Sequence, residues 1–91
     1  MRTPAADRWA TVQDLEQGIE RFLLNGERSL QQLCEQAQRH GVEWATTIRQ
    51  VKALREAGRV EILPGPGLNY KLSDWNRVQM EGERLGNGMR L

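Results

Sequence analysis

The chain has 91 residues, enough for one compact domain, and 38% of them are hydrophobic while 27% are charged. This composition excludes a largely disordered protein. With 13 basic and 12 acidic residues the formal net charge is +1, which excludes a chain covered in positive charge but leaves room for a basic patch on one face.

Cysteine usage and the lack of long apolar runs bear on the compartment. Cys34 is the only cysteine, so no internal disulfide can form, and a reducing compartment is the simpler interpretation. No apolar run reaches the length of a membrane-spanning helix. The first nine residues lack the apolar stretch of a secretory signal. We therefore expect a cytoplasmic protein with no membrane partner.

Three segments have the apolar spacing of amphipathic helices. Capping-box patterns begin the first two, at Thr11 and Ser29, and the acidic Glu43 precedes the third. In the third segment the predicted inner stripe consists of Trp44, Ile48, Val51 and Leu54. Each segment is followed by a glycine suited to ending a helix: Gly26, Gly41 and Gly58.

Beyond Gly58 the apolar spacing changes from the helical period to alternation. Residues 59–63 and 68–73 alternate as strands do, and the sequence Pro-Gly-Pro-Gly lies between them. Proline lacks an N–H group and fixes φ, so this stretch must turn. The sequence predicts a β-hairpin, after which Ser73-Asp74-Trp75 could begin a short fourth helix.

The order of these elements resembles the winged helix-turn-helix family. The resemblance is carried by "HGVEW", which joins the second helix to the third, and by "VKALREAGRVEIL", which leads from the third helix into the hairpin. It implies a mainly α fold with a small β-hairpin, divided into an arm (1–10), the domain (11–73) and a C-terminal helix or tail (74–91). The sequence departs from the family in its hairpin tip, Pro64 to Asn69, which carries no Lys or Arg. It also departs in "GERS", which leaves room for only a residue or two of strand.

The resemblance implies that the third helix binds double-stranded DNA in the major groove. Arg49 could then fork to guanine and Gln50 could pair with adenine, while other basic residues hold phosphates. Expected contacts are Arg28, Ser29, Ala45, Thr46, Arg49, Gln50, Lys52, Ala53, Arg55, Arg59 and Lys71.

Catalysis has little support in the sequence. The single histidine and the single cysteine, His40 and Cys34, are six residues apart, and Cys34 belongs to an apolar stripe. This spacing suits neither a nucleophile–base pair on one helix nor a metal site, which needs more ligands. We expect a protein that is not an enzyme and that uses no cofactor and no metal.

Apolar residues outside the domain could serve a homodimer or pack within the chain. Trp75 and Val78 follow the hairpin, and the two alternatives are equally open for them. The predicted dimer contacts are Trp9, Trp75, Val78 and Leu85.

Two functional classes follow from these observations. The first is sequence-specific DNA binding by a small transcriptional or replication regulator of bacterial, plasmid or phage type. The alternative is an adaptor that binds a protein partner, favoured by the low net charge, the uncharged hairpin tip and the three tryptophans. Binding of single-stranded or structured RNA is a weaker alternative, because the sequence lacks the usual aromatic platform.

Overall fold

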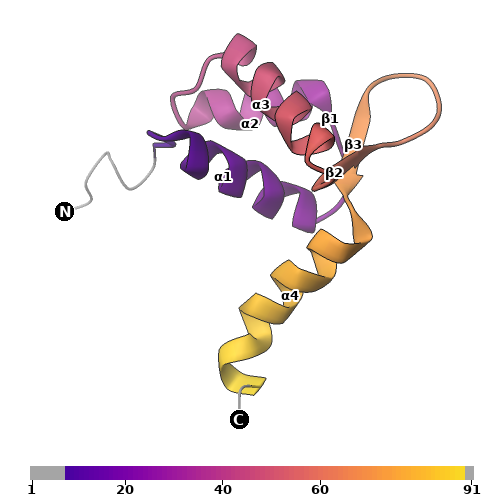
Figure 1. Ribbon diagram of the computed structural model, residues 1–91. Coiled ribbons are helices and arrows are strands. Elements are labelled where there is room, and N and C mark those ends of the chain that lie inside the picture. Colours follow the sequence, from indigo (N-terminus) through magenta and orange to yellow (C-terminus); the bar gives the residue numbers. More distant parts are fainter. Residues whose placement is uncertain (1–7, 90–91) are drawn as a thin grey trace.

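The computed structural model describes residues 8–89, with side chains described from residue 8 to residue 82. Within this range the chain is mainly helical, with four helices and a small three-stranded antiparallel sheet (Figure 1). The elements are α1 (Val12–Leu24), β1 (Arg28–Ser29), α2 (Leu30–Arg39), α3 (Trp44–Glu56), β2 (Val60–Ile62), β3 (Asn69–Leu72) and α4 (Asp74–Met89). The mainly α architecture with a β-hairpin is therefore confirmed, and the fourth helix is longer than expected.

Local side-chain caps fix where the first two helices begin. Thr11 Oγ1 accepts a hydrogen bond from the backbone N–H of Asp14 at 3.0 Å, and Asp14 Oδ2 accepts one from the N–H of Thr11 at 3.2 Å. Ser29 and Gln32 form the same reciprocal pair at the start of α2, at 3.1 and 2.9 Å. Both predicted capping boxes are confirmed, and each N-cap stabilises its helix by about 1 kcal/mol.

The sheet has the strand order β1-β3-β2, so the hairpin also pairs with the short segment between α1 and α2. Ile62 of β2 and Arg28 of β1 both lie opposite Tyr70, on either side of β3. The hairpin tip turns through Gly65 and Gly67, with φ values of 116° and 83° that a residue with a side chain rarely adopts. Sequence analysis left room for only a residue or two of strand before α2, and β1 has two residues.

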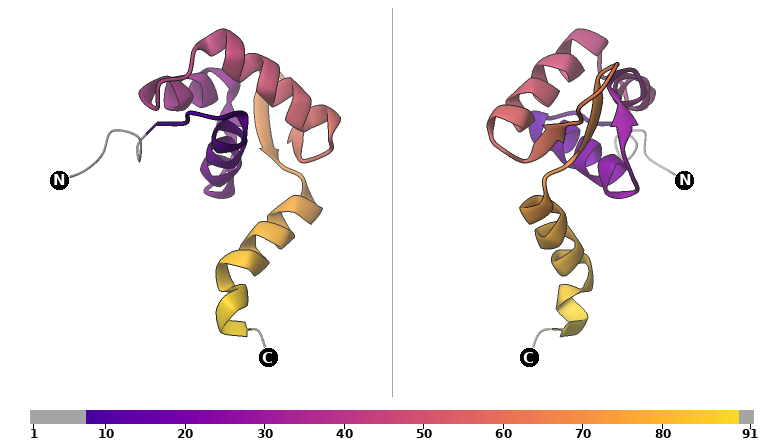
Figure 2. Two further views of the ribbon diagram at one scale, coloured as in Figure 1. Left: turned by 60° about the vertical axis from the view of Figure 1, so that its left-hand side comes forward. Right: turned by 90° about the vertical axis from the view of Figure 1, so that its right-hand side faces the viewer.

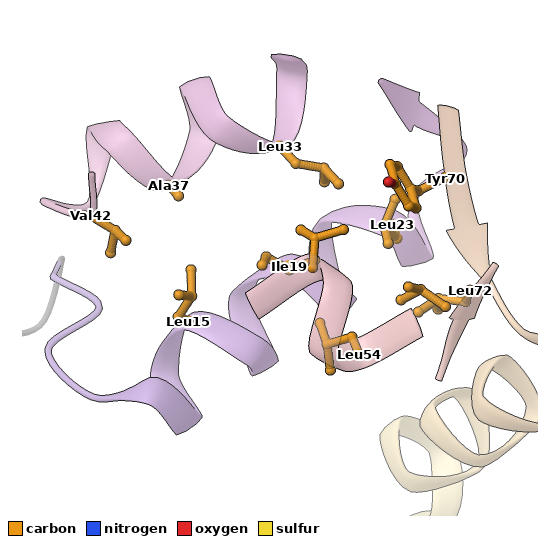
Figure 3. Close-up of a cluster of buried hydrophobic side chains, with 11 residues drawn as sticks. Leu15, Ile19, Leu23, Leu33, Ala37, Val42, Leu54, Tyr70 and Leu72 are labelled. Atoms are coloured by element: carbon orange, nitrogen blue, oxygen red, sulfur yellow. The ribbon is translucent and has the colours of Figure 1, made fainter. Parts of the chain in front are cut away.

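The hydrophobic core lies between α1, α2, α3 and the sheet (Figure 3). Most of the apolar residues predicted to face inward on α1 and α2 point into it, while Val12, at the start of the predicted α1 stripe, is 58% exposed. The hairpin adds Tyr70 and Leu72 from the other side. Its members include Leu15, Ile19, Leu23, Leu33, Ala37, Val51, Leu54 and Val60. Because every second residue of the hairpin strands is apolar, one face of the hairpin covers the core formed by the three helices.

The buried face of α3 differs from the prediction at two positions. Trp44 and Ile48 were expected inside, but they are 40% and 45% exposed. The inner face instead contains Thr47, which is fully buried and whose hydroxyl donates to the carbonyl of Glu43 at 3.1 Å. Because that bond satisfies the hydroxyl, a threonine can occupy a core position. Trp44 lies across the end of α2, where its indole N–H donates to Gln38 at 2.7 Å.

Helix α4 extends away from the three other helices, as the views in Figure 2 show. A buried polar cluster holds its first turn. Glu20 of α1 is 2% exposed and forms an ion pair with Arg59, with Oε2 2.7 Å from Nε, and Oε1 also accepts from Nη2 at 3.0 Å. The amide of Asn76 donates to Glu20 Oε2 at 2.9 Å and to the carbonyl of Arg59 at 3.1 Å.

Trp9 fixes the segment that enters α1. Its ring stacks on His40 with centroids 4.3 Å apart, and its backbone N–H donates to the carbonyl of His40 at 3.0 Å. The opposite face of the ring lies so close to α1 that a Cβ at Gly18 would be 2.2 Å from Cζ2 of Trp9. Gly18 is therefore the residue that lets Trp9 reach its position.

Replacing Gly18 by alanine should destabilise the protein, although alanine ordinarily favours a helix by about 0.5–1 kcal/mol. The steric conflict with Trp9 costs about 1–3 kcal/mol, which outweighs that gain. In a Trp9→Ala background the conflict is gone, so Gly18→Ala should then stabilise. Urea unfolding measures the effect of Gly18→Ala on the free energy of unfolding, once in the wild type and once in the Trp9→Ala variant. If Gly18→Ala stabilises the protein in both, Gly18 and Trp9 do not pack as described.

Candidate nucleic-acid interface

The outward face of α3 is formed by residues opposite its buried side. Ala45, Arg49, Lys52 and Glu56 follow one another at helical spacing, and all four are exposed. They lie opposite the buried stripe that includes Val51. Ala53, which is also exposed, borders this face. The predicted outward position of Arg49 and Lys52 is thus found, and the two alanines leave the backbone accessible on both sides of Arg49.

Three cations on this helix are unpaired. In the described part of the chain, the side chains of Arg49, Lys52 and Arg55 make no hydrogen bond or ion pair, and all three residues are exposed. They follow one another at intervals of three residues and so spread over about a third of the helix circumference. Glu56 is the acid on this face and lies at the C-terminal end. The middle and last turns of α3 therefore carry the three cations, with Glu56 as the acid beside them.

Thr46 and Gln50 lie on the side of α3 that faces α1, and both are half-buried. The amide of Gln50 donates a short hydrogen bond to the carboxylate of Glu16. Glu16 and Gln50 are far apart in the sequence, so periodicity could not reveal this contact. Gln50 must leave Glu16 before it can pair with a base, which distinguishes it from the free Arg49.

The remaining basic residues of the predicted interface are engaged within the chain. Arg59 is committed to Glu20, so its guanidinium does not join the cations of α3. Lys71 lies 3.9 Å from Glu61 and 3.8 Å from Asp74, in exposed pairs that contribute little. Arg28 lies over the ring of Phe22, with its guanidinium carbon 4.7 Å from the centroid. Ser29 caps α2.

An apolar groove that sequence analysis missed lies between α2, α3 and the hairpin tip. It has a volume of about 420 Å³ and includes the exposed side chains of Trp44, Ile48 and Leu68. Cys34 is fully buried beneath it; burial raises the pKa of the thiol, and the charge of Glu35 adds to the effect. Leu68 belongs to the uncharged tip, so the tip supplies an apolar wall beside α3 in place of a charge.

The predicted dimer contacts fall into different environments. Trp9 packs within the chain against Gly18 and His40. Trp75 donates its indole N–H to the carbonyl of Gly58 at 2.8 Å but remains 54% exposed, and Val78 is 68% exposed. The side chain of Leu85 lies outside the described residues.

Comparison with protein-family models gives no match, and comparison with curated proteins gives none at a significant level. Among the residues that the structure describes, no helix has the length and apolar character needed to cross a membrane. Over the same residues, no three histidine, cysteine or acidic side chains come together as metal ligands would.

Proposed function

We propose that the protein binds double-stranded DNA through α3, as a winged helix-turn-helix domain in which the β2–β3 hairpin is the wing. The observation that carries the proposal is the row of unpaired, exposed cations at Arg49, Lys52 and Arg55. Two other basic residues of the predicted interface, Arg59 and Lys71, have carboxylate partners instead. Side chains left without an internal partner on one helix face are available to phosphates and base edges.

The shape of this helix supports insertion into a major groove. The groove of B-DNA is wide enough for a helix, and the N-terminal residues of a recognition helix contact base edges. Ala45 permits close approach in the first turns, where Arg49 is also exposed. The function would be that of a small cytoplasmic regulator of transcription or replication.

Selection of bound duplexes from a random pool at low salt tests the proposal. We expect an enriched sequence, and an affinity that falls steeply as salt is raised, because each phosphate contact releases counterions. If no sequence is enriched and the affinity does not depend on salt, the DNA proposal is wrong.

Lys52→Ala should weaken binding to all sequences alike and reduce the slope of log affinity against log salt by about 1. The physical reason is that a lysine on a phosphate contributes charge but reads no base. Arg21→Ala, which removes an exposed cation of α1, is the matched control and should leave the slope unchanged. Equal slopes for the Lys52 variant and the wild type would place Lys52 outside the interface.

The apolar groove favours a second candidate, a winged-helix adaptor that binds a protein. Trp44, Ile48 and Leu68 expose apolar surface beside α3, and aromatic residues are enriched where proteins bind each other. An adaptor of this kind would bind duplex DNA weakly and without sequence preference. Alanine at Arg49 would then leave partner binding intact, while Ile48→Glu would abolish it.

A further inference from the structure

Glu16 is an acid of α1 that lies at the edge of the proposed DNA-binding helix. Helices α1 and α3 pack against each other, and the Glu16 carboxylate accepts a hydrogen bond from the side-chain amide of Gln50 on α3. Both residues are half-buried. In the described part of the chain Glu16 forms no ion pair, whereas Glu20, one turn further along α1, is paired with Arg59. The negative charge of Glu16 therefore stays beside α3 without a cation to neutralise it.

The bond to Glu16 occupies the group of Gln50 that would read a base. A glutamine recognises adenine with both ends of its amide at once, because the oxygen accepts from N6 and the nitrogen donates to N7. The nitrogen of Gln50 donates to the carboxylate of Glu16 instead, and a hydrogen bond to a charged acceptor is stronger than one between neutral groups. The amide is thus turned toward α1 and away from the outward face that carries Arg49.

The helix surface between Gln50 and Arg49 is open to a released side chain. Ala53 lies three residues after Gln50 and four after Arg49, so it occupies the surface between them, and it is exposed. Its methyl group is too small to keep the two longer side chains apart. The partner on α1, and not the packing of α3 itself, therefore keeps the amide of Gln50 from the outward face.

We propose that Glu16 sets the sequence specificity of α3 by withholding Gln50 from the bases. Glu16 is a positioning residue, since it acts through Gln50, and the inference rests on the proposed function. With Glu16 in place, Arg49 reads DNA and Gln50 does not, and the charge of Glu16 repels phosphates from the α1-facing side of the helix. Without Glu16, Gln50 turns outward and adds one adenine to the selected site.

Urea unfolding of the full chain without DNA tests whether the bond restrains Gln50. Glu16→Ala and Gln50→Ala each remove the same hydrogen bond, so the double variant should be destabilised by less than the sum of the two single variants. Additive effects would mean that Glu16 does not hold Gln50, and the proposal would be wrong. Both side chains are half-buried and outside the hydrophobic core, so circular dichroism should show that the variants fold.

Selection from a random pool of duplexes then tests the effect on specificity. Glu16→Ala should select the wild-type site with one added position, at which adenine is preferred over guanine roughly tenfold. The double variant with Gln50→Ala should lose this preference, because Gln50 is its source. Glu27→Ala removes an exposed acid in the turn after α1 and is the matched control, which should select the wild-type site.

The outcomes separate this inference from the proposed function. If the wild type and Glu16→Ala enrich the same site, the inference is wrong while DNA binding by α3 stands. An adenine preference that persists in the double variant would also overturn it, because Gln50 would not be its source. If neither protein enriches any duplex, the DNA proposal fails and the inference fails with it, whatever the unfolding experiment shows.

Discussion

Replacing Glu20 by alanine is expected to lower the free energy of unfolding by about 1–3 kcal/mol. The carboxylate is buried and accepts from both the guanidinium of Arg59 and the amide of Asn76. Alanine would leave the guanidinium of Arg59 without its acceptor, while the amide of Asn76 would keep only its bond to the carbonyl of Arg59. The loss of a buried acceptor costs more than its hydrogen bonds contribute, although the Arg59 side chain is 40% exposed and water can solvate part of its charge.

Urea unfolding at neutral pH measures this loss. Glu61→Ala is the matched control: Glu61 pairs with Lys71 at the surface, so its loss should change stability by less than about 1 kcal/mol. Replacing Glu20 by leucine together with Arg59 by methionine should recover most of the stability, since no charge is then left unpaired. If Glu20→Ala is as stable as the Glu61 control, the ion pair does not hold the fold.

The Glu20 cluster also connects stability with the arrangement of the outer elements. Arg59 belongs to the turn after α3, and Asn76 belongs to the first turn of α4. Both contact one carboxylate of α1. A loss of Glu20 should therefore loosen the angle between α3 and α4 before it unfolds the core.

Much of the fold could be predicted because it depends on short-range patterns. Thr11 with Asp14 and Ser29 with Gln32 are three residues apart, and each pair closes a capping box within a single turn. The hairpin was predicted because apolar and polar residues alternate on both sides of two prolines, and proline cannot continue a strand. In each case the chemistry that decides the structure lies within a few residues, so the sequence alone contains it.

The errors concern contacts between residues distant in the sequence. Hydrophobicity alone predicted that Trp44 and Ile48 lie in the core, but the buried residues of α3 are Thr47, Val51 and Leu54. Threonine is a polar residue, but the hydrogen bond from the Thr47 hydroxyl to the carbonyl of Glu43 offsets the cost of burying that hydroxyl. The apolar groove was missed for the same reason, since Ile48 and Leu68 meet only once the hairpin folds beside α3.

The candidate site was predictable in part. Arg49 and Lys52 were placed outward by the helical period alone, and the structure has them there. The prediction could not tell which of these side chains are free and which already have a partner within the chain. Arg59 is bonded to Glu20 across 39 positions of sequence, and Gln50 is bonded to Glu16 across 34. That separation decides which residues of α3 are available to a partner.

Arg49→Ala is expected to weaken binding to the selected duplex by about 1–3 kcal/mol and to relax specificity at one base pair. Arg49 is the exposed cation at the centre of the outward face, and arginine can donate two parallel hydrogen bonds to guanine. Competition between duplexes that differ at single positions measures both effects, because the loss should be concentrated on one position. Arg21→Ala should bind like the wild type.

Gln50→Ala provides the comparison that identifies the reading face of α3. Gln50 is held by Glu16, so pairing with a base requires that bond to break first, and we expect its removal to cost less affinity than that of Arg49. If Gln50→Ala instead relaxes specificity while Arg49→Ala binds like the wild type, the helix contacts DNA through its α1-facing side. If neither changes binding to the selected duplex, the bases are not read by α3, and the apolar groove becomes the better guide to function.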